Sequence, residues 1–447
     1  MDHTNLNIPH SAQPRIVILG AGFAGLNLAR NLSGSHFQVV LIDRNNFSQF
    51  QPLFYQVAMA GLEPSAIAFP IRKVFHSSQN VYVRQAEILR VEPDQKTVIT
   101  DYGNIQFDIL AVCLGAETNF YGNANIEKFS FSLKSLGQAL GIRNQIFVDF
   151  EKSMYIKDFK DRQGYIDFVI VGGGPTGVEM AGALAEMKQY VLPKDYPELE
   201  KDEIDIYLVQ SGNRLLPGMS EKSGRNAEKF LRRMGVTVIL NDRVNDYDGN
   251  QAILKSGRKI PTNKLIWAAG IKCPVIPGLE PYYDEKSRRL LVDEHCKVMS
   301  CSDIYALGDI AGMKSDSYPR GHPQVAQVGL QMGDYLSRML SRQQNGDAIR
   351  PFKYKDKGVM ATIGRNKAVA DFPRFSTAGF FTWVIWLWVH LFSLIGIRNK
   401  LLVVFNWMWN YLRFDSSLRL IIEQKNHRAD QNQPPINDYV SENVERS

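Results

Sequence analysis

The sequence predicts an α/β protein with two Rossmann-like dinucleotide-binding domains and a C-terminal amphipathic helical membrane anchor. The first observation is a glycine-rich turn that occurs twice. A β-branched strand runs into G-x-G-x-x-G at Gly20 and again, 152 residues later, at Gly172, and a helical pattern follows each turn. The second observation is an uncharged aromatic stretch at residues 378–397. The two turns imply two dinucleotides in one polypeptide.

The glycine residues of this motif permit a tight turn and let the backbone approach a pyrophosphate, while the next helix offers free N–H groups to that anion. One such motif is a weak indication, whereas two in register are specific. The usual reason to hold two dinucleotides together is hydride transfer from a nicotinamide to a flavin, here NADH and FAD. We expect the dinucleotides to be held by Gly20, Ala21, Gly22, Phe23 and Gly25 in the first copy, and by Gly172, Gly174 and Gly177 in the second.

Length and composition limit the alternatives. A chain of 447 residues suggests two or three domains, and 45% hydrophobic with 22% charged residues is ordinary for a globular protein. The net charge of +6 fits an anionic membrane surface, and without a nucleic-acid-binding motif we expect no nucleic-acid partner. Residues 1–13 lack an apolar signal core, so export is not expected. The four cysteines form no C-x-x-C and read as reduced thiols, with no metal site.

The first half continues with strands. Residues 38–43 form a second strand that ends at Asp43, where a carboxylate would accept hydrogen bonds from the adenosine ribose. Further strands are expected at about 81–91, 95–101 and 107–113. The last of these leads to Gly115, where the backbone returns to the nucleotide.

The second half repeats this plan. A helix over 134–152 precedes the second glycine loop, and another helix begins after it. The strand 204–210 ends at Gln210, the counterpart of Asp43, and residues 265–270 end at Gly270, the counterpart of Gly115. The internal duplication therefore extends beyond the glycine loops.

A buried strand at 304–311 delivers Gly308 and Asp309 to a predicted helix start. We expect the Asp309 carboxylate to face the ribityl hydroxyls or pyrophosphate region of FAD, although an aspartate after a strand is also a common helix N-cap. The predicted parts are 1–119 and 286–376 for FAD, 120–285 for NADH, 377–423 for the membrane-associated helices and 424–447 for a disordered tail.

The C-terminal stretch 378–397 is long enough for a membrane span by hydropathy. Thr382, His390 and Ser393 nevertheless recur along one helical face, and three tryptophans within six residues favour the headgroup interface. The next segment is amphipathic, with asparagines on one face and Leu402, Phe405, Trp409 and Leu412 on the other. We expect an interfacial anchor, with a single span and a dimer contact as alternatives.

Together these residues resemble the two-dinucleotide-binding flavoprotein disulfide reductase superfamily, and within it the type II (non-electrogenic) NADH dehydrogenases. The resemblance rests on the two glycine loops, on Leu307-Gly-Asp-Ile310 and on Phe50-Gln-Pro-Leu-Phe-Tyr-Gln56, Gly172-Gly-Gly-Pro-Thr-Gly-Val-Glu179 and Ala326-Gln-Val-Gly-Leu-Gln331. It implies that NADH reduces FAD, and that the reduced flavin reduces a membrane quinone without proton pumping.

The resemblance also implies roles for single residues. Gln327 and Gln331 would lie near the isoalloxazine, where the quinone docks, and Glu179 would lie between the nicotinamide and quinone sites. Gln51 of the F-Q-P segment would contact the flavin. Without the resemblance, the two glutamines read as a solvent-facing helix side and Glu179 as a surface charge.

Two positions depart from the family pattern. Ser48-Gln49 stands where members commonly have a histidine before F-Q-P, and Gln210 stands where an NAD-specific member presents glutamate. A glutamine carries no charge to repel a 2′-phosphate, and Arg214 could approach that phosphate. We therefore expect NADH as the main donor with NADPH tolerated.

The sequence thus predicts an NADH:quinone reductase that is peripheral on the cytoplasmic face of the cell membrane and forms a homodimer. A disulfide reductase is rejected, since no cysteine precedes Cys113 and the required early cysteine pair is missing. The alternatives that remain are a sulfide:quinone oxidoreductase and an FAD- and NADH-binding redox sensor without significant turnover.

Overall fold

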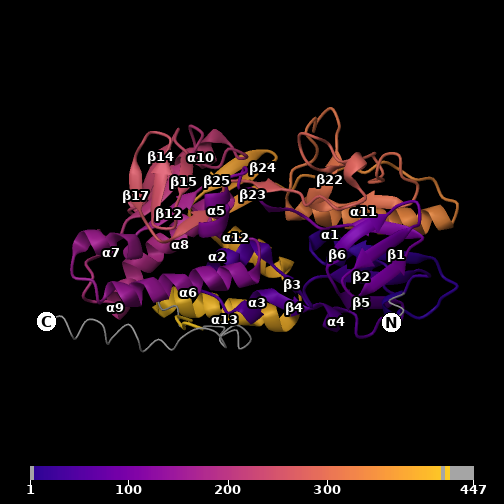
Figure 1. Ribbon diagram of the computed structural model, residues 1–447, viewed down its shortest axis with the longest axis horizontal. Coiled ribbons are helices and arrows are strands. Elements are labelled where there is room, and N and C mark those ends of the chain that lie inside the picture. The colour runs from indigo at the N-terminus through magenta and orange to yellow at the C-terminus, as the bar shows by residue number, and fades with distance from the viewer. Residues whose placement is uncertain (1–4, 414–417, 423–447) are drawn as a thin grey trace, which may run out of the picture.

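The computed structural model describes residues 5–413 and 418–422, so the predicted disordered tail, 424–447, lies outside the described residues. Two lobes lie side by side, one around β1 and the other around β12 (Figure 1). Two short strands, β10 (Glu117–Thr118) and β19 (Ile271–Lys272), pair antiparallel near the ends of the two glycine-terminated strands.

The first lobe is built on a parallel sheet of order β21-β9-β1-β2-β5. Its strands are β1 (Arg15–Leu19), β2 (Gln38–Asp43), β5 (Val81–Gln85), β9 (Ile109–Val112) and β21 (Ile304–Ala306). The helices α1 (Phe23–Asn31) and α11 (Ala326–Gln344) pack against each other beside this sheet (Figure 1). Four residues of β1 are fully buried, as expected of a central parallel strand covered on both faces.

The second lobe repeats this sheet in the order β11-β18-β12-β13-β14, again with every pair parallel. Its strands are β11 (Phe131–Ser132), β12 (Phe168–Val171), β13 (Ile206–Gln210), β14 (Thr237–Leu240) and β18 (Leu265–Trp267). The helices of this lobe are α6 (Leu136–Ser153), α7 (Phe159–Ile166), α8 (Pro175–Tyr190) and α10 (Glu221–Arg233). The duplication expected from the glycine loops is therefore present in the strand order.

A three-stranded antiparallel sheet is inserted at the same place in each half. It consists of β6 (Ile88–Glu92), β7 (Thr97–Thr100) and β8 (Gly103–Gln106) in the first half, and β15 (Val244–Tyr247), β16 (Gln251–Leu254) and β17 (Lys259–Pro261) in the second. The single strand expected at 81–91 was wrong. Residues 86 and 87 turn the chain out of the parallel sheet, so β5 and β6 belong to different sheets.

Two segments pack outside the part to which the sequence assigned them. Residues 50–67, with α2 (Phe54–Ala58) and α3 (Pro64–Ile67), join the core of the second lobe, where α2 packs on α6 and α8. The antiparallel strands β23 (Val359–Gly364), β24 (Lys367–Phe372) and β25 (Phe375–Ala378) also pack there, with β23 lying on α8. The chain therefore returns to the second lobe after completing the first.

The predicted helical stretch at 378–397 is interrupted. Helix α12 (Phe380–Ser393) ends before Gly396, whose φ of +81° suits glycine, and α13 (Ile397–Arg413) begins directly after it. A side chain at Gly396 would meet the ring of Phe69. Within 5–413 and 418–422, no helix is long and apolar enough to cross a membrane.

The remaining elements connect these parts. They are η1 (Asn5–Asn7), β3 (Phe47–Gln49), η2 (Gln51–Leu53), β4 (Ala68–Pro70), α4 (Ile71–Val74), α5 (Ala124–Phe129), α9 (Leu192–Asp195), η3 (Lys201–Glu203), η4 (Glu280–Tyr282), β20 (Leu290–Val292), η5 (Gly308–Ile310) and β22 (Ala311–Met313).

Candidate functional site

The first glycine loop is shaped by its own backbone. Gly20 has a φ of +97°, and a Cβ there would lie 2.6 Å from the carbonyl oxygen of Cys113. A Cβ on Gly25 would overlap the carbonyl oxygen of Gly20, so the first and third glycines are required by packing. Gly22 is different, since a Cβ there would meet nothing within 4 Å. It caps α1 without a side-chain hydrogen bond, which leaves open space in front of free N–H groups where a pyrophosphate fits.

The second loop has the same construction. Gly172 has a φ of +109°, and its Cβ would lie 2.5 Å from the carbonyl oxygen of Ala268, while a Cβ on Gly177 would overlap Gly172. Gly174 again opens onto free space and caps α8 without a side-chain bond. Both loops therefore fit a dinucleotide, and each would lose that space if its middle glycine gained a side chain.

The ends of the second strands are also equivalent. The Asp43 carboxylate accepts a hydrogen bond from the Ala21 N–H (2.7 Å), and the Gln210 side-chain oxygen accepts one from the Gly173 N–H (2.9 Å). Each residue thus ties its strand to the turn after the first glycine. The Gln210 amide nitrogen remains available as a donor toward a ribose or phosphate.

Arg214 is hydrogen-bonded to the backbone of the turn that follows it. Its guanidinium donates to the carbonyl oxygens of Met219 and Pro217, both at 2.8 Å. These bonds hold Arg214 on the 216–219 turn and engage both terminal nitrogens of its guanidinium. These carbonyl oxygens would compete with the 2′-phosphate of NADPH for the Arg214 guanidinium.

The glycines that end the matching strands differ between the halves. Gly115 has a φ of +68° and open space where a side chain would be. Gly270 has a φ of +124°, and the hydroxyl of Tyr121 lies where its Cβ would be. The space beside Gly115 is therefore open, whereas Tyr121 fills the equivalent space beside Gly270.

Asp309 lies in η5, a single 3-10 turn followed by β22, and not at the start of an α-helix. The alternative of a helix N-cap was therefore wrong for this residue. Within the described chain no group donates a hydrogen bond to the Asp309 carboxylate, whose pKa is raised by burial against the opposing charges of Lys134 and Arg289. Gln324 and the Cys273 thiol bond instead to its main-chain oxygen, at 3.0 and 3.3 Å. An enclosed carboxylate without donors suits ribityl hydroxyls.

Glu179 is not the surface charge considered for this position. Part of the side chain is accessible, but protein surrounds the carboxylate, and burial raises its pKa to about 8 while a hydrogen bond from the Thr362 N–H opposes the rise. The Tyr55 hydroxyl, on α2, lies close enough for the Glu179 charge to raise its pKa further. A carboxyl with a pKa near neutrality can exchange protons at physiological pH.

Gln327 and Gln331 are half-buried, and both are hydrogen-bonded to a neighbouring backbone segment. Gln331 accepts from the Lys355 N–H and donates to the Lys355 carbonyl, both at 2.9 Å, in the manner of a paired strand. Gln327 donates to Gly358 (2.8 Å) and accepts from the Lys357 N–H (3.1 Å). The two amides therefore hold the 355–358 segment along the start of α11.

Aromatic contacts connect α12 to the start of α1, next to the first glycine loop. The ring of Phe23 meets Phe50 edge-on at 5.9 Å, and Phe50 meets His390 at 6.2 Å. His390 stacks on Trp386 at 4.0 Å, and burial lowers its pKa to about 4, so the imidazole is neutral. Gln51, next to Phe50, is exposed. Gln49 stands where the family pattern has a histidine, and its side chain accepts a hydrogen bond from the Leu136 N–H at the start of α6 (2.9 Å).

Sequence reasoning did not assign four residues to the site that the structure places near its predicted members. Lys134 is near Asp309, Tyr55 is near Glu179 and Glu186, and His390 contacts Phe50. Glu186 follows Glu179 by seven positions, and this helical spacing was a usable signal. Lys134, Tyr55 and His390 come from distant segments, so no local pattern could have placed them. All four cysteines are free thiols, and the described residues contain no group of three His, Cys, Asp or Glu that could hold a metal.

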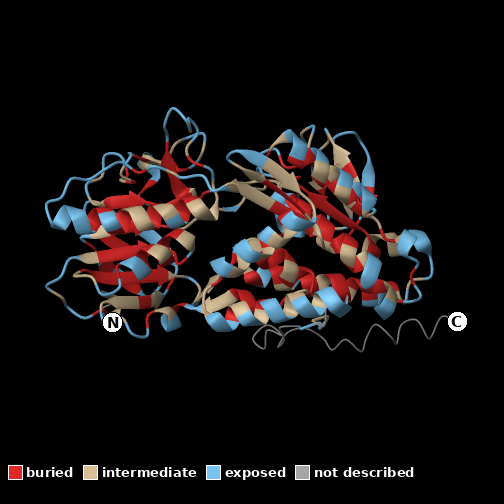
Figure 2. Cartoon of the chain, turned by 180° about the vertical axis from the view of Figure 1, so that it is seen from behind, coloured by how far each residue is buried: buried red, intermediate tan, exposed pale blue. Residues whose placement is uncertain are grey.

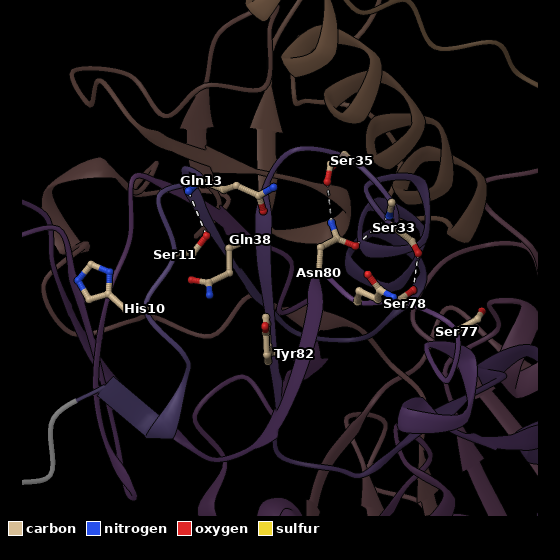
Figure 3. Close-up of a pocket in the computed structure, with 12 residues that line it drawn as sticks. His10, Ser11, Gln13, Ser33, Ser35, Gln38, Ser77, Ser78, Asn80 and Tyr82 are labelled. Carbon is tan, nitrogen blue, oxygen red and sulfur yellow. Dashed lines mark hydrogen bonds between the residues drawn. The ribbon is translucent and has the colours of Figure 1, made fainter.

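A separate polar pocket lies at the amino ends of β2 and β5 in the first sheet (Figure 3). Its side chains include His10, Gln38 at the start of β2 and Asn80 before β5. The Asn80 amide already donates to the carbonyl oxygens of Leu32 and Phe37, both at 2.9 Å. Because the glycine loops follow the opposite ends of these parallel strands, this pocket is not part of the dinucleotide site.

Comparisons with known proteins agree with this geometry. The pyridine nucleotide-disulphide oxidoreductase family model matches residues 14–333, and the NDH2 C-terminal domain model matches residues 357–413. The chain is similar to the type II NADH:quinone oxidoreductase NdhA of Mycobacterium tuberculosis, with 32% identity over 88% of this chain and 86% of the relative. It is also similar to Ndh of the same organism, with 31% identity over 90% of each chain.

Solved structures show the same fold. The structure of NDH2 from Plasmodium falciparum in complex with NADH superposes with a TM-score of 0.84 and 21% identity, covering 92% of this chain and all of that one. The sulfide:quinone oxidoreductase of Aquifex aeolicus has a TM-score of 0.68 and 18% identity, covering 87% of this chain and 92% of that one.

Proposed function

The chain belongs to the pyridine nucleotide-disulphide oxidoreductase family, and within it to the type II NADH:quinone oxidoreductases, and we propose that it oxidises NADH and reduces a membrane quinone without pumping protons. The resemblance inferred from the motifs is thereby confirmed. The observation that carries the function is the pair of matching dinucleotide cradles in a chain whose residues 357–413 match the NDH2 C-terminal domain model. The first cradle would hold FAD, whose redox chemistry, when bound, would connect hydride transfer from NADH to two-electron reduction of the quinone.

We assign FAD to the first cradle and NADH to the second. Asp309, with Lys134 and Arg289 in electrostatic range, adjoins the first loop through Gly308, whose Cβ would lie 3.4 Å from Ala24 of α1. That carboxylate would hold ribityl hydroxyls, and the Asp43 carboxylate the adenosine ribose. The second loop, with Gln210 at its ribose end, would hold NADH and orient its nicotinamide toward the flavin.

We place the quinone on the α11 side of the flavin. Gln327 and Gln331 shape that side by fixing the 355–358 segment, and Glu179, which bonds to Thr362 of β23, supplies a proton to the reduced quinone. A general acid serves best when its pKa lies near the working pH, and burial gives Glu179 that value.

We propose that α12 and α13 form a surface that faces the membrane, because their amphipathic pattern is inverted. The asparagines of α13 point inward, where Asn399 donates to the Ala68 carbonyl and Asn410 to the Gly61 carbonyl, both at 2.9 Å. Large apolar residues of both helices are exposed instead, among them Phe381 (80%), Phe392 (66%), Leu412 (69%) and Phe405 (60%). Figure 2 shows exposed residues along the outer helices of this lobe. A water-soluble helix has the reverse arrangement.

We infer that this surface lies on the cytoplasmic face of the cell membrane. Arg398, Lys400 and Arg413 flank it, as expected of an interfacial helix on anionic lipid. A second copy of the chain could cover part of the same surface, and we expect a homodimer whose remaining apolar face still contacts lipid. A quinone dissolved in the bilayer would reach α12 through the part of the surface that contacts lipid.

Steady-state turnover tests the function. Purified protein reconstituted with FAD should oxidise NADH with a short-chain quinone as acceptor, and the rate should rise when lipid vesicles containing a long-chain quinone are supplied. A redox sensor would bind NADH and bleach its flavin once without sustained turnover. A sulfide:quinone oxidoreductase would reduce the quinone with sulfide and without NADH.

A further inference from the structure

The duplication of the fold identifies equivalent positions in the two cradles, and Gly115 is one of them. A Cβ on Gly20, which opens the first glycine loop, would lie 2.6 Å from the Cys113 carbonyl oxygen and 3.4 Å from the Leu114 Cα. Gly115 is the next residue, so it lies beside the turn that approaches the nucleotide. Its φ is +68°, and a Cβ there would meet nothing within 4 Å. The first cradle is therefore open at this position.

The second cradle has the same construction. A Cβ on Gly172 would lie 2.5 Å from the Ala268 carbonyl oxygen and 2.9 Å from the Ala269 Cα, and Gly270 is the next residue. Gly270 also has a positive φ, of +124°. By this internal symmetry, the space beside Gly270 belongs to the second nucleotide. The Tyr121 side chain fills it, with its hydroxyl oxygen 2.3 Å and its Cζ 3.1 Å from the position of a Cβ on Gly270.

The backbone that carries Tyr121 is anchored to the second lobe. The Asn119 N–H donates to the Gly270 carbonyl (3.1 Å), and the Trp267 indole N–H donates to the Asn119 carbonyl (2.8 Å). The Tyr121 N–H donates to the Asn119 side-chain oxygen (2.9 Å). These bonds hold Tyr121 at a φ of +53°, a conformation that bulky residues rarely adopt and that occurs often at ligand sites.

The side chain of Tyr121 is held far less firmly than its backbone. It is 69% exposed, and within residues 5–413 and 418–422 its hydroxyl has no hydrogen-bond partner. Exposed side chains change rotamer rapidly, so the ring can turn away from Gly270 while the anchored loop stays in place.

We propose that Tyr121 closes the NADH site of the nucleotide-free enzyme and turns aside when the nucleotide binds. This inference rests on the proposed function, in which the second cradle holds NADH. A dinucleotide cannot enter the space beside Gly270 while the Tyr121 hydroxyl is there, so it binds only the open arrangement. The apparent Kd then exceeds the intrinsic Kd by the inverse of the open fraction. Tyr121 thereby lowers the affinity of the site without taking part in hydride transfer.

The competing account makes Tyr121 a wall of the site. In that account the ring packs on the bound nucleotide, or the hydroxyl donates to it, and Tyr121 raises the affinity. The two accounts predict opposite effects of removing the ring. Removal of a wall weakens binding, whereas removal of a side chain that closes the site strengthens it.

NAD⁺ is the probe, because it binds without delivering a hydride. Tyr121→Asn removes the ring and suits the loop, since asparagine tolerates a positive φ. Tyr121→Phe removes only the hydroxyl. Tyr102→Asn is the matched control, because Tyr102 is 70% exposed and lies in the turn between β7 and β8 of the other lobe. All three variants should keep their FAD and their melting temperature.

Calorimetric titration of the FAD-loaded proteins with NAD⁺ measures the effect. Tyr121→Asn should lower the Kd by about threefold or more, as expected when a mostly closed site becomes permanently open. Tyr121→Phe should bind no more weakly than the original protein, and Tyr102→Asn should leave the Kd unchanged. Weaker binding by either Tyr121 variant would establish a wall, and an unchanged Kd in Tyr121→Asn would show that the nucleotide does not use this space. Each of these results would overturn the proposal.

Anaerobic stopped-flow with NADH separates this proposal from the proposed function. Flavin reduction in Tyr121→Asn should reach half its limiting rate at a lower NADH concentration, with the limiting rate within about twofold of the original. A limiting rate lowered about tenfold or more would make Tyr121 part of the hydride-transfer geometry and overturn the proposal. If NADH bleaches both proteins with the same concentration dependence, only the closing role is wrong. If NADH bleaches neither protein, the proposed function itself is wrong.

Discussion

At the residue scale, the environment of Glu179 connects the structure to a measurable pH dependence. Burial raises its pKa to about 8, against an ordinary value near 4.3. The carboxyl is therefore protonated at neutral pH and can donate. It loses the proton as the pH rises through about 8, whereas an ordinary glutamate would already have lost it near pH 5.

We predict that quinone-driven flavin reoxidation is constant below pH 7 and falls about tenfold per pH unit above about 8, as expected when a single acid must be protonated. NADH-driven flavin reduction should not follow this curve. Stopped-flow over pH 6 to 10 measures both. A curve for Glu179→Gln that keeps the same inflection would assign the titration to another group.

The two glutamines of α11 make a second prediction at this scale. Gln331→Leu removes both hydrogen bonds to the Lys355 backbone and loosens the 355–358 segment on the proposed quinone side. We expect it, like Gln327→Leu, to slow quinone reduction much more than flavin bleaching by NADH. Equal loss in both half-reactions would show that the glutamines hold the flavin or the fold.

Nucleotide choice is a third matter for single residues. Gln210 lacks the charge that repels a 2′-phosphate, but the carbonyl oxygens of the 216–219 turn would compete with that phosphate for the Arg214 guanidinium. We predict NADH as the main donor, with NADPH used at a lower kcat/KM. Gln210→Glu should lower the NADPH value further and leave the NADH value nearly unchanged, because a carboxylate still accepts the Gly173 N–H. An unchanged ratio would mean that loop geometry sets the preference.

Single residues also show how far the sequence was informative. The glycines, Asp43 and Gln210 could be placed because each lies at a fixed distance along one strand–turn–helix unit. Tyr55, Lys134 and His390 could not, because each reaches the site from a segment whose position depends on packing between the lobes. The bonds from Arg214 to the carbonyls of the 216–219 turn could not be predicted either, because they depend on the conformation of that turn.

At the element scale, α12 and α13 explain why the C-terminal stretch is apolar on all sides: one face packs in the protein core and the other is exposed. Trp386 and Val403 are almost fully buried in the core of the second lobe, while Trp388 and Phe405 are exposed. Deleting the chain from Ala378 would therefore uncover core residues as well as remove the outer face. The outer face must be changed without touching the inner one.

We predict that Trp388→Gln, Phe392→Gln and Phe405→Gln together weaken flotation with anionic liposomes and lower activity with a bilayer quinone. The same variant should keep its FAD and its activity with a soluble quinone, since these side chains are exposed. Flotation equal to that of the original protein would move the anchor elsewhere. A dimer that dissociates on substitution would assign the surface to the second copy instead.

A buried ion pair lies at the amino end of β18, an inner strand of the second sheet. The Lys264 ammonium lies 3.2 Å from the Asp149 carboxylate, donates to the Tyr165 carbonyl, and is 2% exposed. Desolvation lowers the pKa of Lys264 to about 8 despite this partner. We predict that Asp149→Ala destabilises the protein by about 3–5 kcal/mol, because it leaves a buried charge unpaired.

Chemical denaturation measures the loss, and Glu221→Ala, which breaks the exposed pair with Arg225, is its control and should cost little. The double variant Asp149→Leu/Lys264→Met should recover most of the stability. A small effect of Asp149→Ala would show that water reaches Lys264.

At the scale of the whole molecule, one supersecondary plan has been used twice and then bridged. Each half contributes a parallel sheet, an inserted antiparallel sheet and a glycine loop, and these could be predicted because the two halves repeat locally. The bridging parts could not be predicted. Residues 50–67 and β23–β25 leave the first lobe and pack on the second, and this long-range packing places Tyr55 and Thr362 against α8.

The central claim is that the two cradles pass electrons from NADH to a quinone through one bound FAD. A single-turnover titration without oxygen tests it most directly. We predict that one equivalent of NADH per bound flavin bleaches the flavin, and that one equivalent of quinone restores its colour while quinol forms. A flavin that NADH does not bleach, or a bleached flavin that oxygen reoxidises but quinone does not, would contradict the account.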